Sequence, residues 1–348
     1  MTIFAELFMT ATVKLAPSGT EIQVEPDESI LDAALRQGVM LPYSCRGGSC
    51  GACEAQVLCG SVDYPLGEPN ALNPDQRAAG RALLCQAHAR IDLTVKVREF
   101  GGEDAVPPRV LPARLMQKTR LAHDVMQLDL MLPPNQRLAF RAGQYIDLLL
   151  PGGKRRSFSL ANPPEDDALL SLHIREVPEG YFCGQLESLR EKSVMRIEGP
   201  HGQFWLRSEH QRPVIMVAGG TGFAPLRAML LQLMDAGFTQ PVHLFWGARA
   251  EADLYSQEPL AWADEHDALR YTPVLSEPDE RWSGERGWVH QAVLAHYPAL
   301  SEFDVYMAGP PPMIDAAKAE FAAAGLPMDQ LFFDSFEYAA AGVTGSSS

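Results

Sequence analysis

Four cysteines constrain the fold of this chain more than any other feature of its 348 residues. They are Cys45, Cys50, Cys53 and Cys85. The first three follow the spacing C-x4-C-x2-C, and the fourth stands alone far downstream, whereas zinc sites usually show two short pairs of ligands. Gly47, Gly48 and Gly51 lie inside the short loop, where they let the backbone fold tightly around a bulky centre. We expect the four thiolates to converge on one iron–sulfur centre, with a zinc site or unrelated buried thiols as the alternatives.

This cysteine spacing is typical of plant-type ferredoxins, which hold a 2Fe–2S cluster. Residues 10–98 resemble that family throughout, and the resemblance implies a β-grasp fold. Within them, residues 11–15 and 21–24 predict a hairpin. Ser29 predicts the N-cap of a helix over residues 30–37.

Composition and charge exclude several classes of partner. The net charge of −15 argues against nucleic acid and against an anionic membrane surface. Residues 1–9 lack the features of a signal peptide. Residues 214–234 are interrupted by turn-type residues, so they predict a strand, a loop and a helix rather than a membrane span. Few cysteines remain outside the cluster pattern and Cys59 is expected in the core, so a reducing cytoplasm fits.

A second motif follows the apolar run 144–150. It consists of Arg156, Ser157, Phe158 and Ser159. Alone, these four residues would indicate only a strand with an exposed arginine. In context it resembles the R-x-Y-S flavin signature of the ferredoxin–NADP reductase superfamily, with Phe158 where the family usually has tyrosine. Arg156 can fork onto a phosphate, Phe158 can stack on the isoalloxazine ring, and Ser159 can reach the edge of that ring.

Two further segments complete the predicted flavin site. Their candidate residues are His173, Ile174, Arg175, Gly180, Phe182 and Cys183. The run 180–186 resembles the superfamily's Gly-x-Phe-Ser/Thr segment, where a helix start binds the flavin's phosphates through its amides. Cys183 replaces the usual hydroxyl residue, which leaves its side-chain contact open. The alternative is a strand and a loop with a buried cysteine.

Two glycine loops predict a dinucleotide site. The candidate residues are Gly219, Gly220, Thr221, Gly222, Gly309 and Pro310. The first loop follows a buried strand and opens a helix, so a pyrophosphate can approach its amides. Together the loops resemble the nicotinamide module of the superfamily, although Ala308 stands where the family often has cysteine. Arg249 can take a ribose 2′-phosphate or an adenosine phosphate. The resemblance favours NADH, with NADPH as the alternative, and places Phe336 over the flavin.

The predicted fold class is multidomain, α+β and α/β. Residues 1–100 are expected to form a 2Fe–2S ferredoxin-type β-grasp domain, and residues 101–110 a linker. Residues 111–210 predict an FAD-binding antiparallel β-barrel. Strand-like and helix-like runs alternate over residues 211–338, which indicates a parallel sheet in an NAD(P)H-binding domain. Residues 339–348 are expected to be a flexible tail.

The whole resemblance, over residues 10–338, is to iron–sulfur flavoprotein reductases. It implies FAD, rather than FMN, between a two-electron nicotinamide and a one-electron cluster, with Ser159 and Phe336 at the reacting ring. Three hypotheses remain: a reductase for a separate oxygenase, a reductase for an iron–sulfur dehydratase in deoxysugar synthesis, and a carrier without enzymatic activity. We favour the first, in a monomeric cytoplasmic protein whose partner is a protein electron acceptor.

Overall fold

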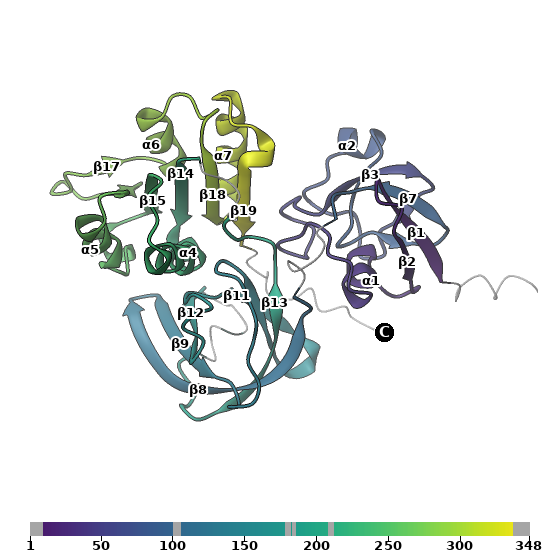
Figure 1. The fold of residues 1–348 in the computed structure, drawn as a ribbon, viewed down its shortest axis with the longest axis horizontal. Coiled ribbons are helices and arrows are strands. Elements are labelled where there is room, and N and C mark those ends of the chain that lie inside the picture. The colour runs from purple at the N-terminus through teal and green to yellow at the C-terminus, as the bar shows by residue number, and fades with distance from the viewer. Residues whose placement is uncertain (1–9, 100–105, 178–181, 183–185, 208–211, 337–348) are drawn as a thin grey trace, which may run out of the picture. The chain divides into compact units, whose positions relative to one another are not determined.

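The structure is a computed structural model (Figure 1). The chain divides into two compact units, Met1–Pro107 and Pro108–Ser348. The residues that the structure describes are 10–99, 106–177, 182, 186–207 and 212–336. Gly180 and Cys183, two of the predicted flavin-site residues, lie outside the described residues.

The first unit is a mixed sheet that packs against a helix. Its strands are β1 (Ala11–Ala16), β2 (Glu21–Val24), β3 (Glu54–Cys59), β5 (Arg81–Leu83) and β7 (Leu93–Lys96), in the order β2-β1-β7-β3-β5. β1 pairs antiparallel with β2 and parallel with β7. The short strands β4 (Val62–Asp63) and β6 (His88–Ala89) form a separate pair. This arrangement agrees with the predicted ferredoxin-type fold.

Local sequence explains the elements of the first unit. α1 (Ile30–Arg36) begins after Ser29, whose Oγ accepts from the amide of Asp32 at 3.1 Å, as predicted. α2 (Pro74–Ala78) begins with a capping box at Asn73. The expectation that Cys59 is a core residue is wrong, because Cys59 is exposed. The register of β3 shifts between Val57 and Cys59, which turns the last residue of the strand toward solvent.

The second unit begins with an antiparallel sheet. Its strands are β8 (Arg109–Ala122), β9 (Val125–Met131), β10 (Tyr145–Leu149), β11 (Arg155–Ser159), β12 (Leu170–Arg175) and β13 (Val194–His201), in the order β11-β10-β13-β8-β9-β12. One isolated bridge, Leu160–Leu172, connects the end of β11 to β12, so the described residues form an open six-stranded antiparallel sheet and not the closed barrel that was predicted. β8 starts inside the predicted linker because Arg109 already pairs with Gly199.

A parallel sheet completes the second unit. Its strands are β14 (Val214–Gly219), β15 (Val242–Ala248), β16 (Leu269–Leu275), β17 (Glu285–Arg286), β18 (Asp304–Gly309) and β19 (Leu331–Ser335), in the order β17-β16-β15-β14-β18-β19. Its helices are α4 (Phe223–Ala236), α5 (Glu258–Glu265), α6 (Val289–His296) and α7 (Pro311–Ala323). Among the described residues, no helix is long and apolar enough to cross a bilayer.

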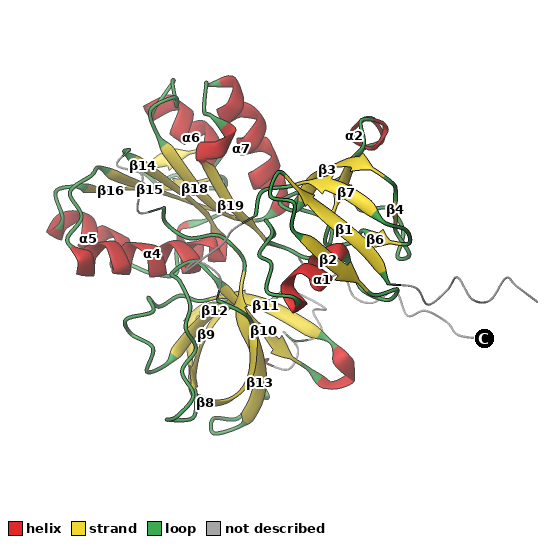
Figure 2. Cartoon of the chain, turned by 45° about the vertical axis from the view of Figure 1, so that its right-hand side comes forward, coloured by secondary structure: helices red, strands yellow, loops and turns green. Residues whose placement is uncertain are grey.

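Helices cover both faces of the parallel sheet, with α4 and α5 on one side and α6 and α7 on the other (Figure 2). Every residue of β14 is buried for this reason. Met216 packs with α4 and α5, whereas Val217 packs with α6 and α7. The strand order reverses between β14 and β18, and a crevice at such a point is the usual ligand site of an open parallel sheet.

Candidate functional site

The cysteine loop of the first unit brings its four thiols together in two pairs. Cys45 and Cys50 are hydrogen-bond partners through their sulfur atoms, and so are Cys53 and Cys85. The bond from Cys50 lowers the pKa of Cys45 to about 4. The same bond, with burial, raises the pKa of Cys50. Two pairs of thiolates are the donor set that two irons require, so these residues fit a 2Fe–2S cluster.

The backbone around these thiols is shaped for a sulfur-rich centre. Arg46 and Gly48 have φ angles of 59° and 80°, which turn the loop sharply. A Cβ atom at Gly48 would lie 2.8 Å from the Cβ of Pro69, so only glycine fits there. The amide of Ala52 donates to Cys50 Sγ at 3.4 Å. Arg46 pairs with Asp32 at 2.6 Å, which ties the loop to α1.

In the second unit, the Arg-Ser-Phe-Ser motif forms the last four residues of β11. Strand alternation puts Arg156 and Phe158 on one face and the two serines on the other. The hydroxyl of Ser157 donates to Asp147 at 2.6 Å, and that of Ser159 donates to Asp334 on β19 at 3.2 Å. Ser159 therefore links the antiparallel sheet to the end of the parallel sheet, whereas the side chain of Ser157 is bonded within its own sheet.

The residues of β12 separate in the same way. Ile174 is buried in the core of the antiparallel sheet, whereas His173 and Arg175 point from the opposite face. The Nδ1 atom of His173 lies 3.2 Å from the hydroxyl oxygen of Tyr255, so this imidazole packs against the parallel-sheet half. Phe182 is buried and packs on Phe158, with ring centroids 5.6 Å apart.

The two glycine loops lie against each other at the carboxyl ends of β14 and β18. A Cβ atom at Gly222 would lie 1.9 Å from the carbonyl oxygen of Ala308, and one at Gly309 would lie 3.1 Å from Cα of Gly219. The amide of Phe336 donates to the carbonyl of Gly309 at 2.9 Å, which places the predicted closing aromatic beside the second loop. Thr221, which belongs to the first loop, is buried.

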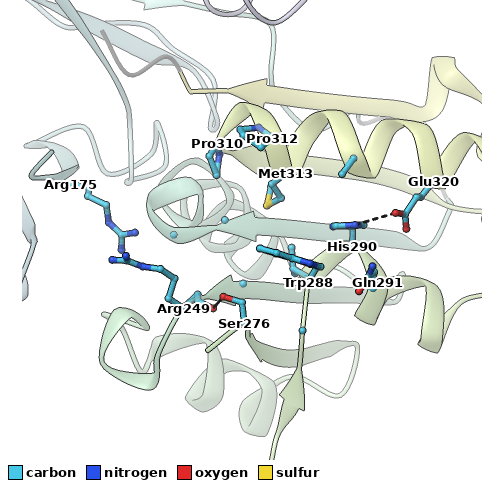
Figure 3. Close-up of a pocket in the computed structure, with 17 residues that line it drawn as sticks. Arg175, Arg249, Ser276, Trp288, His290, Gln291, Pro310, Pro312, Met313 and Glu320 are labelled. Carbon is cyan, nitrogen blue, oxygen red and sulfur yellow. Dashed lines mark hydrogen bonds and ion pairs between the residues drawn. The ribbon is translucent and has the colours of Figure 1, made fainter. Parts of the chain in front are cut away.

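A cavity of about 580 Å³ opens beside these loops. Five predicted residues line it, namely Arg175, Gly219, Gly220, Arg249 and Pro310. Figure 3 shows the guanidinium groups of Arg175 and Arg249 pointing toward each other from opposite halves of the unit. Arg175 is paired with Asp124 at 3.2 Å. Two cations that face each other at a helix start form an anion site of the kind that a pyrophosphate fills.

The far end of the cavity contains residues that the sequence motifs did not identify. Trp288 is 62% exposed and lines the cavity. His290 is buried and its Nε2 lies 3.4 Å from Glu320 (Figure 3). An exposed tryptophan at a cavity edge offers a flat surface for a purine. The sequence offered one indication of this role: Trp288 stands directly before α6, a helix of the parallel-sheet domain.

Comparison with protein families matches the chain in three parts. Residues 13–90 match a 2Fe–2S iron–sulfur cluster binding domain, residues 112–205 an oxidoreductase FAD-binding domain, and residues 216–319 an oxidoreductase NAD-binding domain. The chain therefore carries domains for a 2Fe–2S cluster, FAD and NAD. The order of these three domains is the one that the motifs predicted.

Curated relatives match over nearly their whole length. A CDP-6-deoxy-L-threo-D-glycero-4-hexulose-3-dehydrase reductase from Yersinia pestis is 38% identical, over 94% of this chain and 99% of the relative. The reductase component DmpP of a phenol 2-monooxygenase from Pseudomonas sp. (strain CF600) is 36% identical, over 98% of each chain. Among solved structures, the Amycolatopsis reductase GcoB is similar with a TM-score of 0.78, 33% identity and coverage of 94% and 99%.

Proposed function

From the premise that this chain belongs to the NAD(P)H-dependent iron–sulfur flavoprotein reductases, we propose that it passes electrons from NADH to the terminal oxygenase of a multicomponent system. Nicotinamide supplies two electrons as hydride, a 2Fe–2S cluster takes one at a time, and FAD exchanges either number. The residues of the chain bind and orient these groups. The phenol 2-monooxygenase component DmpP, with 98% coverage of both chains, supports an oxygenase as the acceptor.

One observation carries this proposal most strongly. The strand that ends at Ser159 and the glycine loop at 219–222 belong to different halves of the second unit, yet the Ser159–Asp334 bond brings both to one edge of the parallel sheet. We assign the reacting ring to this edge, with Ser159 and Phe336 beside it. Arg156 and the segment that begins near Phe182 would hold the flavin phosphates, and Phe158 would pack on the isoalloxazine ring.

The cavity beside the loops would hold the nicotinamide dinucleotide. Arg175 and Arg249 would hold its pyrophosphate from two sides, and Trp288 would face the adenine. Among the described residues that line the cavity, Arg175 and Arg249 are the only arginines or lysines, so no further cation remains for a ribose 2′-phosphate, which supports NADH over NADPH. A comparison of NADH and NADPH as reductants measures this preference directly. Equal kcat/KM values would contradict the assignment.

A reductase for an iron–sulfur dehydratase in 3,6-dideoxysugar synthesis is the second candidate. It is supported by the Yersinia pestis relative, which is 38% identical to this chain over 99% of the length of the relative. Reconstitution separates the two candidates: the purified reductase, with NADH, is mixed with either a terminal oxygenase or a dehydratase from the same genome. We expect NADH-dependent turnover with the oxygenase, and turnover with the dehydratase alone would overturn the first choice.

The remaining proposals concern the state of the protein. We expect a monomer that does not bind nucleic acid, and the net charge of −15 supports the second point. A cytoplasmic location agrees with free thiols arranged for an iron–sulfur cluster. Light scattering after size exclusion gives the mass directly, and a species of twice the chain mass would contradict the monomer.

A further inference from the structure

Arg227, on α4, does not line the cavity, yet it joins the two halves of the second unit. Arg227 lies four positions after the first residue of the helix, and its side chain is 20% exposed. Its Nη1 atom donates to the carbonyl oxygen of Ala161 at 2.8 Å. Ala161 comes two residues after Ser159 on the antiparallel-sheet side. The helix that starts at the glycine loop is therefore bonded to the strand end that carries the Arg-Ser-Phe-Ser motif.

Glu258, at the start of α5, fixes the direction of this guanidinium. Arg227 donates from Nε to Oε2 at 2.7 Å and from Nη2 to Oε1 at 2.6 Å, which is a bidentate pair. Ser256 donates its hydroxyl to the same carboxylate at 3.0 Å. A planar guanidinium with two nitrogens engaged has one direction left for Nη1, and that direction leads to Ala161. A lysine could not reproduce this geometry.

The place where Arg227 attaches is the closing point of the antiparallel sheet. The amide of Ala161 donates to the carbonyl of Ser171 at 2.8 Å, next to the bridge that joins β11 to β12. The contact of His173 with Tyr255 lies in the same region. A movement of Ala161 thus shifts both end strands together, and Ser159 moves with them.

The glycine loop is supported by the same part of the chain. Trp246 donates from Nε1 to the carbonyl oxygen of Gly220 at 2.9 Å. The ring of Tyr255 packs edge-on against Trp246, with centroids 5.0 Å apart. In the short segment 255–258, Tyr255 therefore packs on the tryptophan that supports the glycine loop, and Glu258 binds Arg227.

We propose that Arg227, anchored by Glu258, is a positioning residue for hydride transfer, because it sets the separation between the strand end at Ser159 and the glycine loop at 219–222. This inference rests on the proposed function, in which the two groups that react are bound on these two elements. Displacement of a reacting pair by about 1 Å costs roughly a hundredfold in rate. Since Arg227 does not line the cavity, its loss changes the rate of hydride transfer and leaves dinucleotide affinity almost unchanged.

Anaerobic stopped-flow reduction of the FAD-loaded protein tests this, because it separates the hydride-transfer rate at saturating NADH from the dissociation constant of NADH. The variants are Arg227→Met, Arg227→Lys and Glu258→Gln. Arg137→Met is the matched control, since Arg137 forms an exposed ion pair with Asp167 that joins two loops of the antiparallel-sheet half and does not reach the parallel-sheet half. We expect Arg227→Met to lower the rate at least tenfold while the dissociation constant stays within about threefold. Arg227→Lys should restore little of the hydride-transfer rate. The double variant that combines Arg227→Met with Glu258→Gln should transfer hydride no more slowly than Arg227→Met alone.

Hydrogen–deuterium exchange of the cofactor-free protein supplies a second measurement. We expect the peptide over residues 157–163 to exchange faster in Arg227→Met and as in the wild type in Arg137→Met. A lower melting temperature with unchanged rate would overturn the inference, and so would a rise in the dissociation constant that accounts for the whole loss. Unchanged exchange would also overturn it. If NADH never reduces the wild-type flavin, the proposed function fails, and the exchange data then show separately whether Arg227 holds the strand end.

Discussion

A shift from pH 7 to pH 5 is expected to weaken the second unit through His173. This imidazole is buried against Tyr255, and burial, aided by the charge of Arg227, lowers the pKa of His173 to about 3 from 6.5. The unfolded residue binds a proton near pH 6.5, whereas the folded residue does so only near pH 3. Between these values the unfolded state holds more protons, so the free energy of unfolding decreases as the pH falls.

The size of the effect follows from the two pKa values. His173 reduces the free energy of unfolding by about 0.2 kcal/mol at pH 7 and by about 2 kcal/mol at pH 5, relative to a residue that never titrates. His243, buried in the parallel sheet with its pKa lowered to about 4, adds a comparable loss. The contribution of His173 must therefore be measured against a variant. His173→Gln keeps a polar group for Tyr255 and does not titrate.

Urea unfolding followed by tryptophan fluorescence measures this difference. All five tryptophans lie after Pro108, so the signal reports the second unit alone. With cofactor-free protein, we expect the wild type to lose about 2 kcal/mol more than His173→Gln between pH 7 and pH 5. Equal losses in the two proteins would refute the reasoning, because they would mean that His173 is already charged, or exposed, in the folded state.

Three substitutions test other parts of the site. Cys50→Ser should abolish NADH-dependent reduction of cytochrome c and keep that of ferricyanide, which can draw electrons from the flavin; loss of both with FAD still bound would contradict the order of carriers. Gly222→Ala should raise the KM for NADH at least roughly tenfold, because the new Cβ would lie 1.9 Å from the carbonyl oxygen of Ala308 and must separate the loops, and an unchanged KM would contradict this. Arg175→Met should raise the same KM roughly tenfold or more, since a charge-assisted hydrogen bond to phosphate is lost, without loss of FAD. A protein that instead loses FAD would assign Arg175 to the flavin.

The sequence predicted the parallel sheet well because its strands are buried on both faces. Such strands appear as continuous apolar runs, as in residues 214–218, and the glycines at their ends mark the crevice. The helix cap at Ser29 could also be predicted from the sequence, since capping depends on residues three positions apart. The cysteine spacing indicated the cluster loop for the same reason: these signals are local in the chain.

Contacts between segments that are distant in the chain could not be predicted from the sequence. The alternation of β12 already placed His173 and Arg175 opposite Ile174, but nothing local showed that the parallel-sheet half covers that face. The role of Trp288 at the cavity and the bond from Arg227 to Ala161 depend equally on how the two halves of the second unit pack. The exposure of Cys59 depends on an irregularity in strand pairing that no residue type announces.

In the function that we propose, one polypeptide transfers electrons from a two-electron donor to a one-electron cluster through its flavin. Anaerobic titration of the reconstituted protein with NADH, followed by visible and EPR spectra, tests it most directly. We expect complete reduction by about 1.5 equivalents of NADH per chain, two electrons for FAD and one for the cluster, with the EPR signal of a reduced 2Fe–2S centre. Bleaching of the flavin alone, with the cluster still oxidised after excess NADH, would contradict it.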